Sequence, residues 1–271
     1  MQDSEQQLKA TSSKDFAQKR TWYSPVADIY YKARPRYPQE LINRAVVHAK
    51  LSSNSKILEV GSGPGNATVA FAQLGAYMTC LEPNQEFCHL AEQNCAPYPK
   101  VKIYNTSFEE WELVANKFNA VLGANAFHWI PPEIGYSKAA EALVDNGFLI
   151  LLWNLTPEPQ YEIYQALESV YLAYAPSLVR YEGAETQAEI LRNFGEKVLD
   201  SGYFRELVCE QIACEVTYSI DDYLKLLSTL RKLSPQVKDL LFTNLREKLL
   251  PFGDSVQLSF LSAVHVARKA Q

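Results

Sequence analysis

The 271-residue sequence predicts a doubly wound α/β fold with a mostly parallel sheet of seven strands, the last of them antiparallel. From about residue 40, short apolar runs alternate with longer helical stretches, which indicates successive strand–helix units. Each run is apolar on consecutive positions and is bounded by turn residues. Consecutive apolarity is typical of parallel strands that helices cover on both faces.

Five runs predict the parallel part of the sheet. In chain order they are KILEV (56–60), AYMTCLE (76–82), VKIYN (101–105), FNAVLGA (118–124) and GFLILLWN (147–154). Helices are expected between them. Gly75 has the residue type that closes a helix starting near Asn66. Asn84 is a suitable N-cap for the following helix, whose apolar face is Phe87, Cys88, Ala91 and Cys95.

The last third of the chain changes character. Residues 158–198 read as aromatic-rich helix, 204–218 as a strand, and about 220–249 as helices. The chain then ends in SVQLSFLSAVHVARK, where apolar and polar positions have opposite parity: Val256, Leu258, Phe260, Val264 and Val266 against Gln257, Ser259 and His265. This period of two predicts a strand with one better-solvated face, as expected near a sheet edge, and an antiparallel strand would close the sheet there.

The organisation along the chain follows from these elements. After a flexible N-terminal lead (1–20), a single domain is expected over 21–271, divided into a lid (21–38), a ligand-binding core (56–154), a helical cap (156–202) and C-terminal strands and helices (203–271). In the lid, aromatic residues alternate with arginines. Such a segment can cover a bound cation by cation–π contact or clamp a carboxylate, and the alternative is that its rings only pack on the core.

Composition narrows the classes of function. Hydrophobic residues make up 47% of the chain, so a full core can form, and no apolar stretch is long enough to cross a bilayer. The formal net charge of −5 and the lack of a long basic run argue against nucleic acid as the main partner. The five cysteines form no C-x-x-C pair, so we expect no metal site and no disulfide framework, and a reducing cytoplasm fits best. The polar N-terminus does not resemble a signal peptide.

A glycine-rich loop, Glu59-Val60-Gly61-Ser62-Gly63-Pro64-Gly65, follows the first predicted strand. Such a loop brings backbone N–H groups and a helix N-terminus to one point and lets a ligand approach closely. No lysine follows as in a phosphate-binding P-loop, and the third glycine stands one place too early for the dinucleotide pattern. The E-x-G-x-G-x-G spacing favours a nucleoside-binding loop, and a tight turn without a ligand is the alternative.

An acidic residue supports the nucleoside interpretation. Glu82 ends the second apolar run, 21 residues after Gly61. In a doubly wound fold, an acid at the tip of the second strand accepts hydrogen bonds from the ribose hydroxyls of a nucleoside. The same position also suits an acid that stabilises the start of the next helix, and the two roles are compatible.

The sequence resembles class I S-adenosylmethionine-dependent methyltransferases, which have a Rossmann-like fold. Three blocks carry the resemblance: ILEVGSGPGNATVAFAQLGAYMTCLEPNQEF, VLGANAFHWI and DNGFLILLWN. With YYKARPRYP upstream, AFHWI followed by LLWN is similar to a small-molecule branch that includes trans-aconitate-methyltransferase-like proteins. The resemblance covers roughly residues 25–155 well and is weak over 156–271.

The resemblance implies S-adenosylmethionine as cofactor, S-adenosylhomocysteine as product, and a set of cofactor-binding residues. The residues that match the family's cofactor positions are Glu59, Gly61, Ser62, Gly63, Gly65, Glu82, Pro83, Asn84, Ser107, Phe108, Asn125 and Ala126. Arg34, from the expected lid, is added because the related stretch in the family borders the cofactor. The chain departs from the family at Ser107, where an acid usually receives the adenine amino group, so Phe108 could cover the ring instead.

For catalysis, the resemblance places His128 on the acceptor side, after the fourth strand. His128 is the best candidate for a general base among the four histidines, with a purely structural role as the equal alternative. Tyr30, Trp129, Trp153 and Tyr164 are expected in the substrate pocket. Tyr161, Tyr164, Tyr171 and Tyr174 recur at helical spacing, so most of this group is expected to be packing.

The expected function is a cytoplasmic methyltransferase, a transferase that moves a methyl group to the oxygen, nitrogen or carboxylate of a small-molecule acceptor. The protein would be a monomer or a homodimer. A non-catalytic protein that binds S-adenosylmethionine as a regulator is the main alternative, because the loop and Glu82 would serve both. A nicotinamide-dependent oxidoreductase is disfavoured by the glycine spacing.

Overall fold

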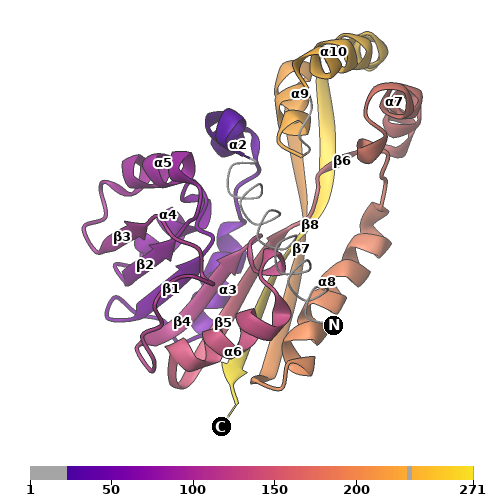
Figure 1. Ribbon diagram of the computed structural model, residues 1–271. Coiled ribbons are helices and arrows are strands. Elements are labelled where there is room, and N and C mark those ends of the chain that lie inside the picture. Colours follow the sequence, from indigo (N-terminus) through magenta and orange to yellow (C-terminus); the bar gives the residue numbers. More distant parts are fainter. Residues whose placement is uncertain (1–22, 231–233, 271) are drawn as a thin grey trace, which may run out of the picture.

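A central sheet of eight strands organises the described residues, 23–230 and 234–270, of this computed structural model (Figure 1). The strand order is β3-β2-β1-β4-β5-β8-β6, and β7 also pairs with β8. The parallel strands are β1 (Lys56–Val60), β2 (Tyr77–Leu81), β3 (Val101–Tyr104), β4 (Phe118–Ala124) and β5 (Leu143–Asn154). The expected mostly parallel sheet is confirmed, and each of the first five strands overlaps one of the five predicted runs, with differences only at the ends.

Helices cover both faces of this sheet. On one face, α3 (Gln39–His48) and α4 (Asn66–Ala72) contribute Leu41 and Phe71 to a core with strand residues such as Ile57 and Leu122. On the other face, α6 (Pro132–Ala142) and α8 (Gly183–Asp200) pack on residues such as Val121. Burial on both sides explains why the strands are apolar at consecutive positions.

The C-terminal strand β8 (Ser255–Lys269) is antiparallel, as expected, and it lies near the sheet edge without forming the edge itself. It runs antiparallel between β5 and β7 (Phe204–Ser219), and the two-residue strand β6 (Glu158–Pro159), which brings the number of strands to eight, also pairs with it. Exposed and buried residues alternate only in its first half. His265 is buried because β5, β7 and α8 enclose the second half.

A helical cap stands at one end of the molecule, where β7 and β8 extend beyond the parallel strands (Figure 1). It consists of α7 (Tyr161–Tyr174), α9 (Ile220–Ser228) and α10 (Pro235–Leu249), which share one hydrophobic cluster. This packing differs from the expected division at residue 202, because α8 belongs to the sheet face and α9 and α10 belong to the cap. In the part of the chain described, no helix has the length and apolar character needed to span a membrane.

The expected lid appears as a segment that we call the strap, residues 23–38. It contains the short 3-10 helix η1 (Ser24–Val26) and α2 (Ala27–Ala33), followed by extended backbone. The strap passes between α5 (Gln85–Cys95) and the cap helix α9, and it contacts both. The flexible lead expected over 1–20 and the first two lid residues, 21 and 22, lie outside the described residues.

Local signals near α5 are confirmed. The Asn84 side chain accepts a hydrogen bond from the Phe87 N–H at 3.1 Å, which makes it the N-cap of α5. The predicted apolar face of this helix, Phe87, Cys88, Ala91 and Cys95, is buried. Gly75, with φ of 78°, lies in the turn after α4.

Candidate cofactor and acceptor site

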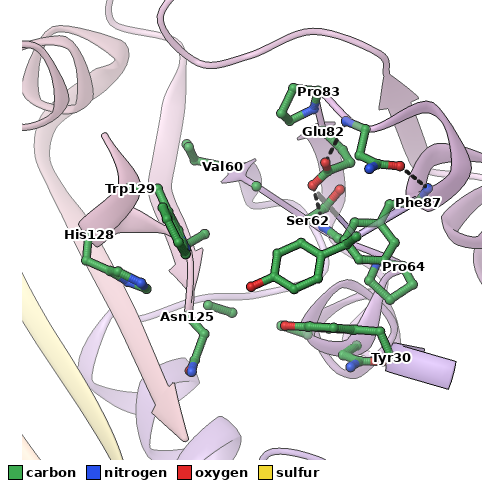
Figure 2. A pocket seen from close by; sticks show the side chains of 18 of the residues that line it. Tyr30, Val60, Ser62, Pro64, Glu82, Pro83, Phe87, Asn125, His128 and Trp129 are labelled. Carbon is green, nitrogen blue, oxygen red and sulfur yellow. Dashed lines mark hydrogen bonds between the residues drawn. The ribbon is translucent and has the colours of Figure 1, made fainter. Parts of the chain in front are cut away.

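A cavity of about 340 Å³ lies at the carboxyl ends of the parallel strands, beside the adjacent strands β1 and β4. After β1 the chain continues to β2 and β3 on one side of the sheet, and after β4 it continues to β5 on the other side. This is the switch point at which doubly wound sheets bind their ligands, and the volume lies within the usual range of such pockets. Figure 2 shows two groups of lining residues facing each other. Ser62, Glu82, Pro83 and Phe87 lie on one side, and Asn125, His128 and Trp129 lie on the other.

The glycine loop forms one wall through a tight turn held against β2. The Gly61 and Ser62 N–H groups both donate to the Leu81 carbonyl, at 2.8 and 3.1 Å. Gly61 has φ of 65°, and a Cβ added there would lie 2.7 Å from the Cβ of Ala126, in the loop that follows β4. Only glycine allows the two loops to approach this closely.

Glu82 joins the glycine loop to the start of α5. One carboxylate oxygen accepts from the Gly63 N–H and the other from the Asn84 N–H, each at 2.8 Å (Figure 2). The side chain lines the cavity and is only 5% exposed. Burial raises its pKa to about 7, although the two backbone N–H groups favour the charged form. Glu82 therefore holds the loop in shape at the place where the sequence predicts a ribose.

Ser62 offers an unsatisfied polar atom at the same wall. Its hydroxyl oxygen is buried and has no hydrogen-bond partner among the described residues. Buried polar groups are nearly always paired, so an orphan group beside a cavity fits a ligand that completes its hydrogen bonding. This supports a polar ligand in contact with the loop.

Glu59 does not line the cavity, although it belongs to the loop motif. Side chains alternate along β1, so Val60 borders the cavity while Glu59 points to the other face. There its carboxylate accepts from the Thr68 hydroxyl at 2.7 Å and from the Cys80 thiol at 3.5 Å. The residue is fully buried, and burial raises its pKa to about 7.

We expect Glu59→Gln to change how stability depends on pH. Because the pKa of Glu59 is raised from 4.5 to about 7, the folded protein holds this proton more tightly than the unfolded chain does. The free energy of unfolding therefore falls as pH rises through this window, by up to about 3 kcal/mol. Glu59→Gln removes the titrating group, so the variant should gain that amount relative to wild type between pH 5 and pH 8.

Denaturant unfolding at both pH values measures this difference, and because Glu82 titrates in both proteins, the comparison reports Glu59 together with its coupling to Glu82. Glu86→Gln, which changes an exposed glutamate of α5, is the matched control and should follow wild type. Parallel pH curves for wild type and Glu59→Gln would contradict the raised pKa.

The residues expected beside an adenine all lie at the cavity. Pro83, Asn84, Ser107 and Phe108 all line it, and Phe108 is 2% exposed. The Ser107 hydroxyl accepts from the Glu110 N–H at 3.3 Å. Ser107 thus caps a local turn, and the apolar faces of Pro83, Phe87 and Phe108 supply most of this wall.

Asn125 connects β4 to β5 and to the strap. It has φ of 48° and lines the cavity together with Ala126. Its amide pairs with the backbone of Asn154, accepting from the N–H and donating to the carbonyl, both at 2.7 Å. The Tyr37 hydroxyl donates to the same amide oxygen at 3.2 Å. This network fixes the turn after β4, where the methionine end of the cofactor is expected.

His128 faces the cavity from η2 (Phe127–Trp129) and is surrounded by aromatic rings. Its ring lies 5.1 Å from Trp129, 5.6 Å from Trp153 and 6.3 Å from Phe194, centroid to centroid. Part of the residue is exposed, but desolvation by these rings and the charge of Lys197 both lower its pKa from the ordinary value. The described residues place no hydrogen-bond partner on the imidazole, so His128 is a neutral group available to a ligand.

Four of the expected site residues do not line the cavity. Besides Glu59, these are Gly65, Trp153 and Tyr164. Gly65 begins α4 and packs near Cys95 and Ala91.

Trp153 and Tyr164 belong to cores instead of the predicted substrate pocket. Trp153 is 3% exposed, and its indole N–H donates to Nδ1 of His265 at 3.1 Å. Tyr164 packs in the cap, 5.1 Å from the ring of Tyr181. The expected pocket residues Tyr30 and Trp129 do line the cavity, as does Arg34.

Several lining residues escaped the sequence analysis, among them Phe87, Thr156 and Leu230. Phe87 was recognised only as part of an apolar helix face, although its position one turn after the ribose acid could have indicated the cavity. Thr156 follows β5 and Leu230 follows α9. No local pattern marks these two, and Leu230 reaches the cavity through the packing of the cap.

Comparison with known proteins supports a methyltransferase domain and the same fold. Residues 57–147 match a model described as a methyltransferase domain. An uncharacterized methyltransferase of Mycobacterium tuberculosis is 30% identical over 129 residues, which cover 48% of this chain and 50% of that protein. A ribosomal RNA small subunit methyltransferase A of Bacillus thuringiensis is 24% identical over 232 residues, which cover 80% of this chain and 76% of that protein. The chain thus spans about half the length of the first of these relatives.

A solved methyltransferase structure has a similar fold. Phosphoethanolamine N-methyltransferase 2 of Haemonchus contortus, in complex with S-adenosyl-L-methionine, superposes with a TM-score of 0.56 at 14% identity, covering 95% of this chain and 60% of that one. The narrower resemblance to trans-aconitate-methyltransferase-like proteins stays a prediction. Residues 57–147 thus carry a methyltransferase domain, within a chain that has the fold of a solved methyltransferase structure.

Proposed function

We propose that this protein is an enzyme that transfers a methyl group from S-adenosylmethionine to a small-molecule acceptor. The observation that carries the proposal is the cavity at the switch point. In its wall, the Glu82 carboxylate is bonded to the glycine loop, and the buried hydroxyl of Ser62 has no partner among the described residues. A nucleoside with a polar tail fits these groups. The opposite end is lined by His128 and Trp129, and we assign the second, small ligand to it.

The described residues suggest how the cofactor would be held. Glu82 would accept from the ribose hydroxyls, and Ser62 with the loop N–H groups would meet the polar methionine end. Phe87 and Phe108 would enclose the adenine. Asn125 and Ala126 would border the sulfur from the other side. The bound cofactor supplies an electrophilic methyl group on a positively charged sulfur, and the protein supplies position and exclusion of water.

The acceptor end is the part of the cavity that the expected cofactor-binding residues do not border. Tyr30, His128, Trp129, Thr156 and Leu230 line it. In-line displacement requires the acceptor atom to be held on the far side of the methyl group. Aromatic walls can fix a small molecule there and keep water out. His128, neutral because of its lowered pKa, can accept a proton from an acceptor that carries one.

Charge supports a small acceptor over RNA, although one relative is named a ribosomal RNA methyltransferase. The net charge is −5, and the strap covers the cavity from outside with Tyr23, Tyr30 and Tyr37. A polynucleotide would need a basic track leading to the site. All five cysteines are free thiols, three of them buried, which favours a reducing cytoplasm. Whether the protein is a monomer or a homodimer stays a prediction.

We expect Glu82→Ala to weaken binding of S-adenosylhomocysteine by about 1–3 kcal/mol, or roughly 5- to 150-fold. The change removes the expected ribose acceptor and leaves the Gly63 and Asn84 N–H groups without their partner. Titration calorimetry measures the affinity. Glu109→Ala is the matched control, because Glu109 lines the same cavity without holding the glycine loop, and its affinity should stay near wild type. Equal affinity in wild type and a folded Glu82→Ala would contradict the ribose role.

The acceptor can be found by incubating the protein with a metabolite pool and isotope-labelled S-adenosylmethionine, followed by mass spectrometry. The proposal predicts a labelled small-molecule product that depends on the active protein. Total RNA in a parallel reaction tests the macromolecular alternative. Cofactor binding without any labelled product in either reaction would favour a regulatory protein that binds the cofactor without turnover.

A further inference from the structure

The strap contacts both ends of the cavity. At the cofactor end, the rings of Tyr23 and Tyr30 lie 5.7 and 5.2 Å from the ring of Phe87 on α5. All three rings line the cavity. At the other end, Arg34 binds the strap to the cap helix α9, and the Tyr218 hydroxyl of β7 donates to the Ala33 carbonyl at 2.6 Å. A single short segment therefore joins the cofactor wall to the cap.

Arg34 makes two of these hydrogen bonds. Its Nε donates to the Thr229 hydroxyl at 2.9 Å, and its Nη2 donates to the Thr229 carbonyl at 3.0 Å. Thr229 is the C-cap of α9 and is 1% exposed. The last carbonyls of a helix lack partners within the helix and carry partial negative charge, so a guanidinium there satisfies an acceptor and complements the helix dipole.

This contact lies one residue from the acceptor wall. Leu230, directly after Thr229, lines the cavity. Its N–H donates to the Leu227 carbonyl at 3.1 Å, so its position continues the last turn of α9. Any shift of the C-terminal turn of α9 therefore moves an acceptor-facing side chain.

The same guanidinium is coupled to the cofactor side. It lies 4.9 Å from the centre of the Tyr30 ring, and that ring packs on Phe87. A ligand that fills the space beside Phe87 restricts Tyr30, and Tyr30 in turn supports the guanidinium that holds Thr229. The contacts form a continuous series from α5 through the strap to Leu230.

We propose that Arg34 is a positioning residue that couples occupation of the cofactor site to the order of α9 and hence to the acceptor wall at Leu230. This inference rests on the proposed function, because it takes an S-adenosyl ligand as the occupant. It assigns Arg34 a role different from that of a direct clamp for a substrate carboxylate. The side edge of its guanidinium, Nε with Nη2, is already engaged by Thr229.

The coupling has an energetic basis. Ordering the strap costs conformational entropy, and a ligand that orders it removes that cost for the contacts on its other side. Cofactor binding would therefore stabilise the Arg34–Thr229 contact without touching α9. An acceptor would then meet a preformed wall and would bind better after the cofactor, by reciprocity of coupling between sites.

Hydrogen exchange of the full-length protein with saturating S-adenosylhomocysteine tests the coupling without knowledge of the acceptor. In wild type, we expect exchange to slow in residues 23–38 and also in α9, residues 220–229, by about 5-fold or more. In Arg34→Gln, protection of residues 220–229 by the ligand should be lost, while calorimetry confirms that the site is occupied. Arg34→Lys, which keeps the charge but cannot make both bonds, should restore only part of it.

Arg36→Gln is the matched control. Arg36 lies on the same strap and carries the same charge, but its guanidinium donates to Asn66 and lies over the ring of Tyr31. Protection of α9 by the ligand should therefore persist in this variant. Thr229→Val removes the hydroxyl that accepts from Arg34 and changes no cavity-lining side chain. This variant tests the coupling even if Arg34→Gln no longer binds the ligand. It should reduce the protection of α9.

The outcomes separate the two proposals. If wild type does not bind S-adenosylhomocysteine, the proposed function fails, and the coupling fails with it. If the ligand binds and protects residues 23–38 but leaves exchange in α9 unchanged, the coupling is wrong while the proposed function stands. The same holds if Thr229→Val retains full protection of α9, or if Arg34→Gln binds the ligand and retains it.

Discussion

Gly61→Ala is expected to abolish detectable binding of S-adenosylmethionine and to lower the free energy of unfolding by about 2–5 kcal/mol. Gly61 has φ of 65°, a conformation that costs other residues about 1–2 kcal/mol. The added Cβ would also lie 2.7 Å from the Cβ of Ala126, so the loops after β1 and β4 must separate. Forced overpacking of this kind costs about 1–3 kcal/mol more.

Binding suffers because both loops belong to the cavity wall. Moving Gly61 displaces the N–H that donates to Leu81 and shifts Ser62 and Gly63 away from Glu82. Gly63→Ala is the matched control for stability. It has a similar φ of 55°, but no atom lies within 4 Å of its added Cβ, so only the cost of about 1–2 kcal/mol for backbone strain should appear. Denaturant unfolding of the two variants, with calorimetry for binding, measures both effects. Equal stability of the two variants would contradict the close approach of the loops.

His128→Ala should lower turnover by about 10²- to 10⁴-fold for an acceptor that must lose a proton, while cofactor affinity stays near wild type. His128 lines the acceptor end of the cavity and carries no hydrogen bond to another described residue. Because its pKa is lowered below 6.5, it is already neutral above that pH. The acid limb of the pH–rate profile due to this group should therefore lie below pH 6.5, and the rate should not rise through His128 deprotonation above it.

His128→Phe distinguishes proton transfer from packing. Phenylalanine can keep the ring contacts with Trp129, Trp153 and Phe194 but cannot accept a proton. If His128 acts as a base, His128→Phe should be nearly as slow as His128→Ala. If the ring only shapes the wall, His128→Phe should recover most of the turnover. For an acceptor that is a carboxylate, no base is needed, and both variants should mainly change the KM of the acceptor.

Much of the fold was predictable because local patterns determine it. The consecutive apolar runs identify β1 to β5, and Asn84 marks the start of α5. The burial of β8 was not predictable from its own sequence. Its alternation of apolar and polar residues suggested a better-solvated face near an edge, but β7 pairs along nearly its whole length and α8 covers the face that holds His265. Burial of that histidine depends on residues distant in sequence.

The candidate site was likewise predictable only in part. The motif identified Gly61, Gly63 and Glu82, which meet because adjacent parallel strands end at one edge of the sheet. It also included Glu59, which the alternation of β1 turns away toward Thr68. Leu230 could not be found from the sequence, since the place of α9 beside the cavity depends on its packing against the strap, β7, β8 and α10.

Binding of S-adenosylhomocysteine to the wild-type protein, measured by titration calorimetry beside NAD under the same conditions, tests the central claim most directly. The claim is that the cavity between the glycine loop and His128 is built for an S-adenosyl nucleoside. It predicts saturable binding of one S-adenosylhomocysteine per chain, weakened by Glu82→Ala, and no saturable binding of NAD. Binding of NAD in preference to S-adenosylhomocysteine, or saturable binding of neither, would contradict it.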